Sequence, residues 1–458
     1  MHKHLAVLIL HLALASNYSL LAAAGEWSTF QGDAAHTGYV PGSFNPAQFQ
    51  QVWNKAFPGI SSIYNLQPIA VGEGKVFLAV TSYFSSPEEL HAFDARSGNE
   101  LWSTTLVDPT GPNGANGGLE GISPPAYMNG AVYATIAGSQ SAVYGFNASS
   151  GAQQFSTPYA NQIVNYGAPT AFAGNVYSES GTYGGMAAFN GSTGQSQWFT
   201  NLQQQNGWSA AVDLTHSYVY MGQQNSPTGT LYALNRTTGA VDYQILDPGS
   251  STQTIGTNSN LMLGNMHDAF VANGAVTGYL PQALVRFDLD AHTISWAVPG
   301  QFQGGMAVAN GKVYAINNDV LEVRDELTGI LLWSWTQPQQ GLHQVGLDSN
   351  IVVTDSHVFV GASSYVPSST SNTYAIDLQT HQEVWSVGLG GYLALADNVL
   401  YIESFTGTTG PATEYLMAIS LAVPEPNSLV LAALGFAGLA AWCWRRRCRA
   451  YPVACGLG

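Results

Sequence analysis

Two short groups of potential metal ligands are the first residues to consider for chemistry. His267 and Asp268 are adjacent, and a single leucine separates Asp288 from Asp290. A cation that prefers oxygen ligands takes about six of them, so each group would depend on partners from distant parts of the chain. Asp290 also falls inside a predicted hairpin turn, where a solvated side chain is the usual state of an aspartate. The sequence therefore predicts no metal site and no resident cofactor.

Acid–base and nucleophilic chemistry has equally little support. Five histidines are dispersed along the chain, and none stands at a fixed spacing from a second ligand: His36, His91, His216, His343 and His357. Taken singly, they are expected on the surface or in turns. The sequence contains no nucleophile elbow and no recognisable triad motif, while a triad assembled from distant loops stays open.

Cysteines and charges restrict the chemistry further. The only cysteines, Cys443, Cys448 and Cys455, lie close to the C-terminus, so the main body has neither a disulfide nor a thiol. Residues 25–425 contain seven of the 12 Lys and Arg against all 28 Asp and Glu. A body with this acidic excess repels the phosphates of nucleic acid and anionic lipid, so we expect no nucleic-acid partner.

Both ends of the chain have the pattern of targeting segments. Residues 1–24 combine a basic start, an apolar stretch over 5–14 and the small run Ala22-Ala23-Ala24, which predicts a secretory signal peptide cleaved after Ala24. Near the other end, an apolar run over 428–444 has the minimum length that crosses a bilayer, about 17 residues. It follows Pro424, Glu425 and Pro426 and stops at Arg445, Arg446 and Arg447, which would stay on the cytoplasmic side.

The tail over 423–458 resembles the tripartite PEP-CTERM sorting signal. The Pro-Glu-Pro motif, the apolar segment and the arginines stand in that family's order, and the resemblance implies recognition by an exosortase-type processing enzyme. One departure is the extension from Cys448 to Gly458, beyond the basic cluster where members of the family usually end. We expect an exported protein that is anchored, transiently or permanently, through a transmembrane helix over 428–444.

One motif recurs seven times and organises the region between these ends. An Asp or Asn precedes an aromatic residue by eight positions in every copy, and the residue four after the Asp or Asn is Gly or His. The Asp or Asn side chain can bond the amides of a turn, while Gly, or His at some cost, supplies a left-handed residue. The turn residues are Asp94, Gly98, Asn147, Gly151, Asn190, Gly194, Asn235, Gly239, Asp288, His292, Asp325, Gly329, Asp377 and His381.

The aromatic anchors recur with a mean period near 47 residues and indicate a ring. They are Trp53, Trp102, Phe155, Trp198, Tyr243, Trp296, Trp333 and Trp385. Each repeat contains three or four short strands, the content of one propeller blade. Trp53 has no strands before it, whereas strands over 393–404 and 415–421 have no anchor after them. We therefore expect an all-β, eight-bladed propeller over residues 25–422, in which the N-terminal strand completes the last blade and removes the open edge.

The repeat resembles that of quinoprotein-like (PQQ-like) propellers. Residues 92–102 are similar to that family's A-x-D-x-x-T-G-x-x-x-W docking motif, and residues 27–38 are similar to the segment that begins such domains. The resemblance implies tryptophans packed between blades. It also raises the possibility of a dehydrogenase that uses pyrroloquinoline quinone, stacked on a disulfide of adjacent cysteines and held with calcium by Glu, Asn and Asp. Residues 25–425 contain no cysteine, so the stacking element is missing.

Three functions are kept as hypotheses. The first is an exported, non-catalytic propeller that binds a polysaccharide or protein partner at the cell surface or in the extracellular matrix. The second is a quinone-dependent oxidoreductase, and the third is a polysaccharide-acting enzyme. Loops on a rigid scaffold are the usual place for binding. The long segments 108–118 and 247–260 are therefore the candidate binding loops. The aromatics Tyr166, Tyr183 and Trp208 could stack on sugar rings, with packing in the blade core as the more common role of such residues.

Overall fold

In the described part of the computed structural model, the regular secondary structure is β-strand apart from one short 3-10 helix. The described part covers residues 25–60, 69–80, 88–106, 119–138, 141–160, 167–180, 184–202, 209–222, 229–248, 261–273, 282–338, 347, 349–362, 371–406 and 412–422. The chain divides into a unit over 1–421 and a second unit over 422–458. The predicted signal peptide, the Pro424-Glu425-Pro426 motif, the 428–444 segment and the arginine cluster lie outside the described ranges. Within those ranges, no helix has the length and apolarity needed to cross a bilayer.

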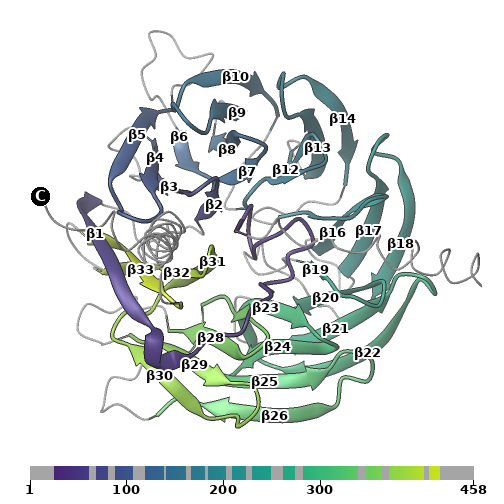
Figure 1. The fold of residues 1–458 in the computed structure, drawn as a ribbon. Coiled ribbons are helices and arrows are strands. Elements are labelled where there is room, and N and C mark those ends of the chain that lie inside the picture. Colours follow the sequence, from purple (N-terminus) through teal and green to yellow (C-terminus); the bar gives the residue numbers. More distant parts are fainter. Residues whose placement is uncertain are drawn as a thin grey trace, which may run out of the picture. The chain divides into compact units, whose positions relative to one another are not determined.

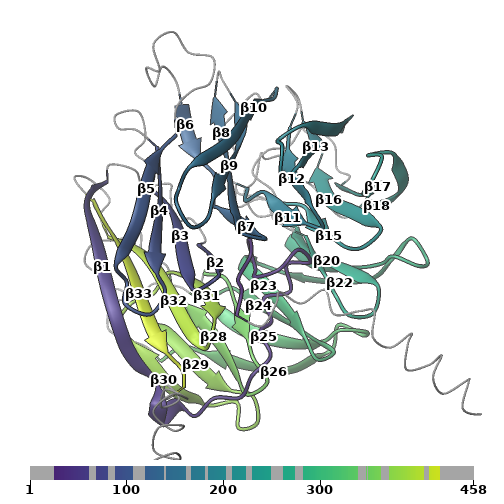
Figure 2. The same cartoon turned by 45° about the horizontal axis from the view of Figure 1, so that its top comes forward.

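Eight antiparallel sheets follow one another along the chain, and we number them blades 1 to 8 (Figures 1 and 2). Blade 1 contains β2(Ala70–Gly72), β3(Lys75–Val80), β4(Glu89–Asp94) and β5(Glu100–Thr105). Blade 2 contains β6(Leu119–Ile122), β7(Ala126–Met128), β8(Ala131–Gly138), β9(Ala142–Asn147) and β10(Gln153–Pro158). Blade 3 contains β11(Thr170–Phe172), β12(Asn175–Glu179), β13(Gly185–Asn190) and β14(Ser196–Asn201). Blade 4 contains β15(Ala211–Val212), β16(His216–Gly222), β17(Gly229–Asn235) and β18(Val241–Asp247).

The second half of the ring repeats the arrangement. Blade 5 contains β19(Met262–Leu263), β20(Asp268–Asn273), β21(Gln282–Asp288) and β22(Thr293–Gly300). Blade 6 contains β23(Phe302–Ala309), β24(Lys312–Asn317), β25(Val320–Asp325) and β26(Leu331–Thr336). Blade 7 contains β27(Val352–Val353), β28(His357–Gly361), β29(Thr373–Asp377) and β30(Glu383–Val387). Blade 8 contains β31(Tyr392–Ala396), β32(Val399–Thr406), β33(Ala412–Ser420) and, from the other end of the chain, β1(Gln50–Ile60), which follows the short 3-10 helix η1(Pro46–Gln48).

The pairing of β1 with β33 closes the ring. The two strands run antiparallel, with Trp53 opposite Ala418 and Ala56 opposite Tyr415. The innermost strand of blade 1, β2, in turn contacts β31 of blade 8 and β7 of blade 2. The predicted eight-bladed propeller and its closure by the N-terminal strand are therefore confirmed.

The apolar core lies between neighbouring blades. Phe77 of blade 1 stacks on Tyr127 of blade 2, with ring centroids 5.8 Å apart, and both belong to one cluster with Val132 and Tyr144. Burial falls from the axis outward, because all residues of β2 are buried whereas β5 alternates between exposed and half-buried positions. This gradient is what a radial stack of twisted sheets produces.

Candidate functional site

Each hairpin between the third and fourth strands is built around its Asp or Asn. The Asp94 Oδ1 atom accepts from the amides of Arg96 and Ser97, at 3.2 and 2.8 Å, and the hydroxyl of Ser97 lowers the pKa of Asp94 most. The same side-chain oxygen accepts bonds from the backbone amides of the turn in the other repeats, in Asn147, Asn190, Asn235, Asp288, Asp325 and Asp377. These residues shape turns, and they do not converge on one another.

The turns form the sockets for the aromatic anchors of the preceding blade. Four indole Nε1 atoms donate to the carbonyl that follows the Asp or Asn in the next blade, at 3.0 to 3.2 Å: Trp53 to Ala95, Trp102 to Ala148, Trp198 to Arg236 and Trp296 to Glu326. The rings of these tryptophans lie against Gly98, Gly151, Gly239 and Gly329, and the ring of Phe155 lies against Gly194. The anchors therefore join successive blades.

Two sockets use histidine instead of glycine. His292 and His381 have φ angles of 54° and 59°, in the left-handed region. Their rings stack on the anchors of the preceding blades, with centroids 3.8 Å apart for Tyr243–His292 and 4.4 Å for Trp333–His381. The last anchor, Trp385, packs edge-on against Phe49 just before β1, with centroids 5.5 Å apart. These histidines contribute to packing.

Replacing Gly239 with alanine should destabilise the ring much more than replacing Gly311. Both glycines have a φ of 73°, but a Cβ at Gly239 would lie 2.6 Å from the Trp198 ring, whereas a Cβ at Gly311 would meet nothing within 4 Å. The left-handed backbone alone costs about 1–2 kcal/mol, and overpacking adds about 1–3 kcal/mol. Urea denaturation should separate Gly239→Ala from Gly311→Ala by at least about 1 kcal/mol, and equal losses would contradict the role of the socket.

The centre of the ring is filled by residues 27–40, which we call the axial segment. Its backbone bonds the free edges of innermost strands, which face the axis (Figure 1). Trp27 and Val71 exchange two backbone hydrogen bonds. Five further carbonyls of the segment accept from backbone amides of the blades, and all seven bonds measure 2.6 to 2.9 Å: Ser28 from Tyr127, Ala34 from Val212, Ala35 from Leu263, Thr37 from Val308 and Gly38 from Val353. Blades 1, 2, 4, 5, 6 and 7 are thus tied to one segment.

Side chains tie the remaining blades to the same segment. The Thr29 hydroxyl donates to the Pro169 carbonyl next to β11 of blade 3, at 2.8 Å. The Asn350 amide donates both to Gln31 Oε1 and to the Leu393 carbonyl of blade 8, each at 2.8 Å. Gln31 also donates to the Met306 carbonyl. Most of the hydrogen bonds at the axis are thus made within the chain, whereas the buried Trp27 Nε1 has no hydrogen-bond partner among the described residues.

Two ionisable side chains are fully buried in the axial segment. The Asp33 carboxylate accepts from the amide and hydroxyl of Thr37, at 3.1 and 2.6 Å, yet burial raises its pKa to about 6. His36 Nδ1 lies 2.9 Å from the Leu261 carbonyl, and burial lowers the pKa of this histidine to about 4. Because a carbonyl only accepts, the neutral ring donates from Nδ1. His36 is buried, so the expectation of a surface position is wrong, although its amide closes a turn by donating to the Asp33 carbonyl at 3.1 Å. The expectation for His357 is wrong as well, because this residue is buried at the start of β28.

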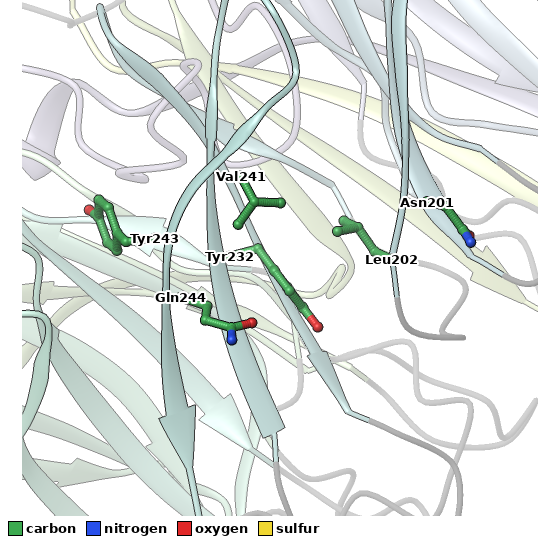
Figure 3. Close-up of a pocket in the computed structure, with 6 residues that line it drawn as sticks. All are labelled: Asn201, Leu202, Tyr232, Val241, Tyr243 and Gln244. Atoms are coloured by element: carbon green, nitrogen blue, oxygen red, sulfur yellow. The ribbon is translucent and has the colours of Figure 1, made fainter.

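A pocket of about 570 Å³ opens between blades 3 and 4 (Figure 3). Asn201 and Leu202 line it from blade 3, and Tyr232, Val241, Tyr243 and Gln244 line it from blade 4. Tyr232 and Gln244 are directly opposite each other on β17 and β18. The volume is in the range of small-ligand sites, about 300–1,000 Å³. The two carboxamides can bond the hydroxyls of a sugar, whereas Tyr232 is only 9% exposed and the ring of Tyr243 stacks on His292.

Two buried acidic groups lie elsewhere in the ring. In blade 8, Glu403 and Glu414 share a hydrogen bond across β32 and β33, and burial raises the pKa of Glu414 to about 8. In blade 5, Arg286 Nε donates to Asp268 Oδ2 at 2.6 Å, and burial together with Asp268 raises the pKa of the nearby Glu326 to about 7. The pairs Glu403–Glu414 and Asp268–Arg286 have no signal in the sequence, because the partners are separated along the chain and strand pairing brings them together.

The potential metal ligands found in the sequence do not assemble. His267 Nδ1 lies 2.7 Å from Asp290 Oδ1 on the surface, while Asp268 is bound to Arg286. Across the described ranges, no group of three or more His, Cys, Asp or Glu has the arrangement of a metal site. His343, Tyr166, Tyr183 and Trp208, the whole of segment 108–118 and most of segment 247–260 lie outside the described ranges.

Comparisons with known proteins agree with this architecture. A family model described as outer membrane protein assembly factor BamB matches residues 37–154 and 86–276, which together span more than half of the chain. A second model, the PEP-CTERM protein-sorting motif, matches residues 422–447. No curated protein sequence matches the chain.

Several solved structures share the fold at low sequence identity. A europium-containing methanol dehydrogenase has a TM-score of 0.61 and 14% identity, covering 87% of this chain and 99% of its own. BamB from Moraxella catarrhalis has a TM-score of 0.57 and 14% identity, covering 83% and 99%. Quinohemoprotein alcohol dehydrogenase from Comamonas testosteroni has a TM-score of 0.61 and 16% identity, covering 90% and 82%. At these identities the likeness is one of fold, shared by enzymes and by BamB.

Proposed function

The chain belongs to the PQQ_2 repeat family, described as outer membrane protein assembly factor BamB, and from this premise we propose that it is an exported, non-catalytic binding propeller. Its partner is a polysaccharide or a protein of the cell surface or extracellular matrix. The observation that carries the proposal is the axial segment. The central channel is the natural cavity of a propeller, and here residues 27–40 run along it with hydrogen bonds to blades 1 to 7 and, through Asn350, a link to blade 8.

The residues around the axis do not fit a quinone cofactor. Pyrroloquinoline quinone is an anionic tricarboxylate, so its site calls for cationic partners. Residues 25–425 contain seven Lys and Arg, and none of them stands in the axial segment or on an innermost strand of the described ranges: Lys55, Lys75, Arg96, Arg236, Arg286, Lys312 and Arg324. We therefore derive no reaction through this group.

A cofactor assay tests the non-catalytic part of the proposal. Purified full-length protein is mixed with pyrroloquinoline quinone and calcium, and the reduction of a dye is followed with alcohols and sugars as substrates. We expect no turnover and no saturable binding of the quinone. Saturable binding together with turnover would support the alternative, a quinone-dependent oxidoreductase, which the methanol and alcohol dehydrogenases among the similar structures favour.

Export and anchoring rest on the two ends of the chain. The match to the PEP-CTERM sorting motif supports processing by an exosortase-type enzyme, and the predicted signal peptide supports export. We expect a tagged protein in the cell envelope or medium, and a variant without residues 2–24 in the cytoplasm. Replacing Pro424, Glu425 and Pro426 with alanine should change the size of the mature product. Cytoplasmic wild-type protein would refute this part.

The pocket between blades 3 and 4 is our candidate for the binding site. Its exposed amides, Asn201 and Gln244, can be removed without opening the core. We expect the double variant Asn201→Ala/Gln244→Ala to bind extracellular polysaccharide at least tenfold more weakly than wild type. The control is Gln197→Ala, an exposed amide on the same strand β14 that does not line the pocket. Release of soluble sugars during the assay would instead support a polysaccharide-acting enzyme.

A further inference from the structure

Four large apolar side chains stand exposed at the tips of turns in three consecutive blades. Leu214, Met266, Leu327 and Ile330 are between 47% and 64% exposed. Leu214 lies between β15 and β16 of blade 4, and Met266 lies between β19 and β20 of blade 5. Leu327 and Ile330 lie between β25 and β26 of blade 6. We call these residues the apolar tips.

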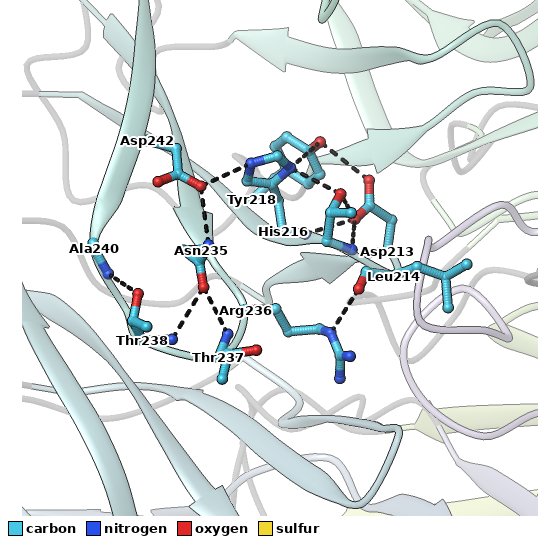
Figure 4. Close-up of polar contacts among 11 residues, drawn as sticks. Asp213, Leu214, His216, Tyr218, Asn235, Arg236, Thr237, Thr238, Ala240 and Asp242 are labelled. Carbon is cyan, nitrogen blue, oxygen red and sulfur yellow. Dashed lines mark hydrogen bonds and ion pairs between the residues drawn. The ribbon is translucent and has the colours of Figure 1, made fainter.

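The apolar tips share one face of the propeller. In each of these blades, a backbone hydrogen bond joins the turn after the innermost strand to the turn after the third strand. The amides of Arg236, Leu289 and Glu326 donate to the carbonyls of Thr215, His267 and Gly311, respectively, at 2.9 to 3.2 Å. Figure 4 shows this arrangement in blade 4, where Arg236 Nε also donates to the Leu214 carbonyl at 3.1 Å. The Asp213 carboxylate bonds Thr215 and His216. Leu214 therefore projects from a rigid turn.

The same positions in other blades are polar or small. The corresponding turns include Glu73-Gly74, Asn129-Gly130, Asn310-Gly311, Asp355-Ser356, Arg96-Ser97, Ser149-Ser150, Ser192-Thr193 and Gln379-Thr380. The repeat thus requires no apolar residue at a tip. Neighbouring apolar side chains exposed to water on one face are typical of a surface that is covered in use.

The body of the protein ends on this same face. The amide of Leu421, just after β33, donates to the carbonyl of Asn398 in the turn between β31 and β32, at 2.8 Å. Only six residues separate Leu421 from Ser428, where the predicted membrane segment begins. Even fully extended, this link spans about 25 Å. A bilayer that holds the segment therefore begins within about 25 Å of Leu421 along the chain.

Basic and acidic residues are mixed on this face. Lys75, Arg96, Arg236 and Lys312 lie in or beside its turns, whereas Arg286 and Arg324 are paired with Asp268 and Glu322. The same turns also contain Glu73, Asp94, Asp213, Asp290, Asp355 and Asp397. The half-buried Arg236 guanidinium, beside Leu214, bonds the Leu214 carbonyl through Nε and lies over the Phe172 ring, with Cζ 5.6 Å from the ring centroid. The overall acidic charge disfavours an anionic surface, so the expected surface is a zwitterionic one.

We propose that the apolar tips of blades 4 to 6 insert into the headgroup region of the bilayer that holds the C-terminal segment. This inference rests on the proposed anchor. Tethering by a short link gives an effective concentration in the millimolar range, so even weak insertion is populated. The propeller would then be held with its hairpin turns toward the membrane.

Hydrogen exchange on the full-length protein tests the proposal. The protein is reconstituted into phosphatidylcholine vesicles and compared with the same protein in detergent. We expect peptides that contain residues 213–216, 264–268 and 326–331 to exchange at least tenfold more slowly in the vesicles. The quadruple variant Leu214→Gln/Met266→Gln/Leu327→Gln/Ile330→Gln should lose this protection.

A matched control replaces four equally exposed apolar residues on outer strands. Leu101, Phe199, Leu246 and Val384 are between 41% and 58% exposed, and their replacement with glutamine should leave the protection intact. A protein that enters the vesicles but keeps all three turns unprotected would overturn this inference and leave the anchor standing. A protein that does not enter them would overturn both. Protection that appears without vesicles at high protein concentration would show self-association and also overturn it.

Discussion

Raising the pH from 5 to 9 is expected to lower the free energy of unfolding of the wild-type protein by about 3–5 kcal/mol more than that of Glu414→Gln. The pKa of Glu414 is raised from 4.5 to about 8 in the folded protein. Its protonated form is therefore favoured by folding, and the stability that it provides is complete below pH 4.5 and is lost as the pH rises through 8. Urea denaturation at intervals across this range measures the difference.

The reason for this alkaline loss lies in the closing blade. Glu403 faces Leu416 and Glu414 faces Phe405 across β32 and β33, so the two carboxyl groups are diagonal neighbours on one face of the sheet. Both are buried, and a hydrogen bond joins them. One proton lets them share that bond, whereas two negative charges at this distance repel each other in a poorly solvated site.

The control for Glu414 is an exposed glutamate. Glu100→Gln makes the same chemical change on the outer strand β5 and should leave the pH dependence unaltered. Since β33 pairs with β1, alkaline opening should also be seen first as faster hydrogen exchange in residues 50–57 and 412–420. If hydrogen exchange instead became faster to the same extent in all blades, the prediction that blade 8 opens first would be wrong.

The hairpins and the ring closure could be predicted because their signals are local. An Asp or Asn, a left-handed residue four positions later and an aromatic residue eight positions later describe one turn and one docking contact. The strand that contains Trp53 and the strands over 393–404 and 415–421 then remained without partners, and pairing them in one blade was the arrangement that left no open sheet edge. Tyr243 was predicted as a blade anchor, and its second role in lining the pocket with Tyr232 could not be foreseen, because the pocket forms between two blades.

Buried polar contacts across the ring gave no local signal. His36 and Leu261 are 225 positions apart, and Gln31 and Asn350 are 319 positions apart. His36 stands at no fixed spacing from a second ligand, so its side chain was expected at the surface or in a turn, whereas the structure buries it. The resemblance of residues 27–38 to the start of other propeller domains was the one available pointer. It marked the segment as part of the fold without revealing its place at the axis.

Acidification should separate two opposing contributions within the axial segment. The pKa of His36 is about 4 in the folded protein and 6.5 in its ordinary state. Between these pH values the unfolded chain binds a proton at His36 and the folded protein does not, so acidification lowers the free energy of unfolding. This contribution is complete above pH 6.5 and falls by about 3 kcal/mol as the pH drops through 4. Asp33 acts in the opposite direction, because its pKa is raised to about 6. Its contribution grows by about 3 kcal/mol as the pH falls from 6 to 3.8.

In the wild-type protein these two opposing contributions should nearly cancel, so the free energy of unfolding should change little with pH on their account. Each single variant should show the contribution of the residue that remains. His36→Asn, which tolerates the left-handed backbone at this position (φ 62°), should gain about 3 kcal/mol relative to wild type as the pH falls from 6.5 to 4. Asp33→Asn should lose a similar amount, and the double variant should again follow wild type. Urea denaturation at pH 4, 5, 6 and 7 measures all four proteins. If His36→Asn kept a constant offset from wild type at every pH, the ring of His36 would be solvated, and the axial segment would not fill the channel.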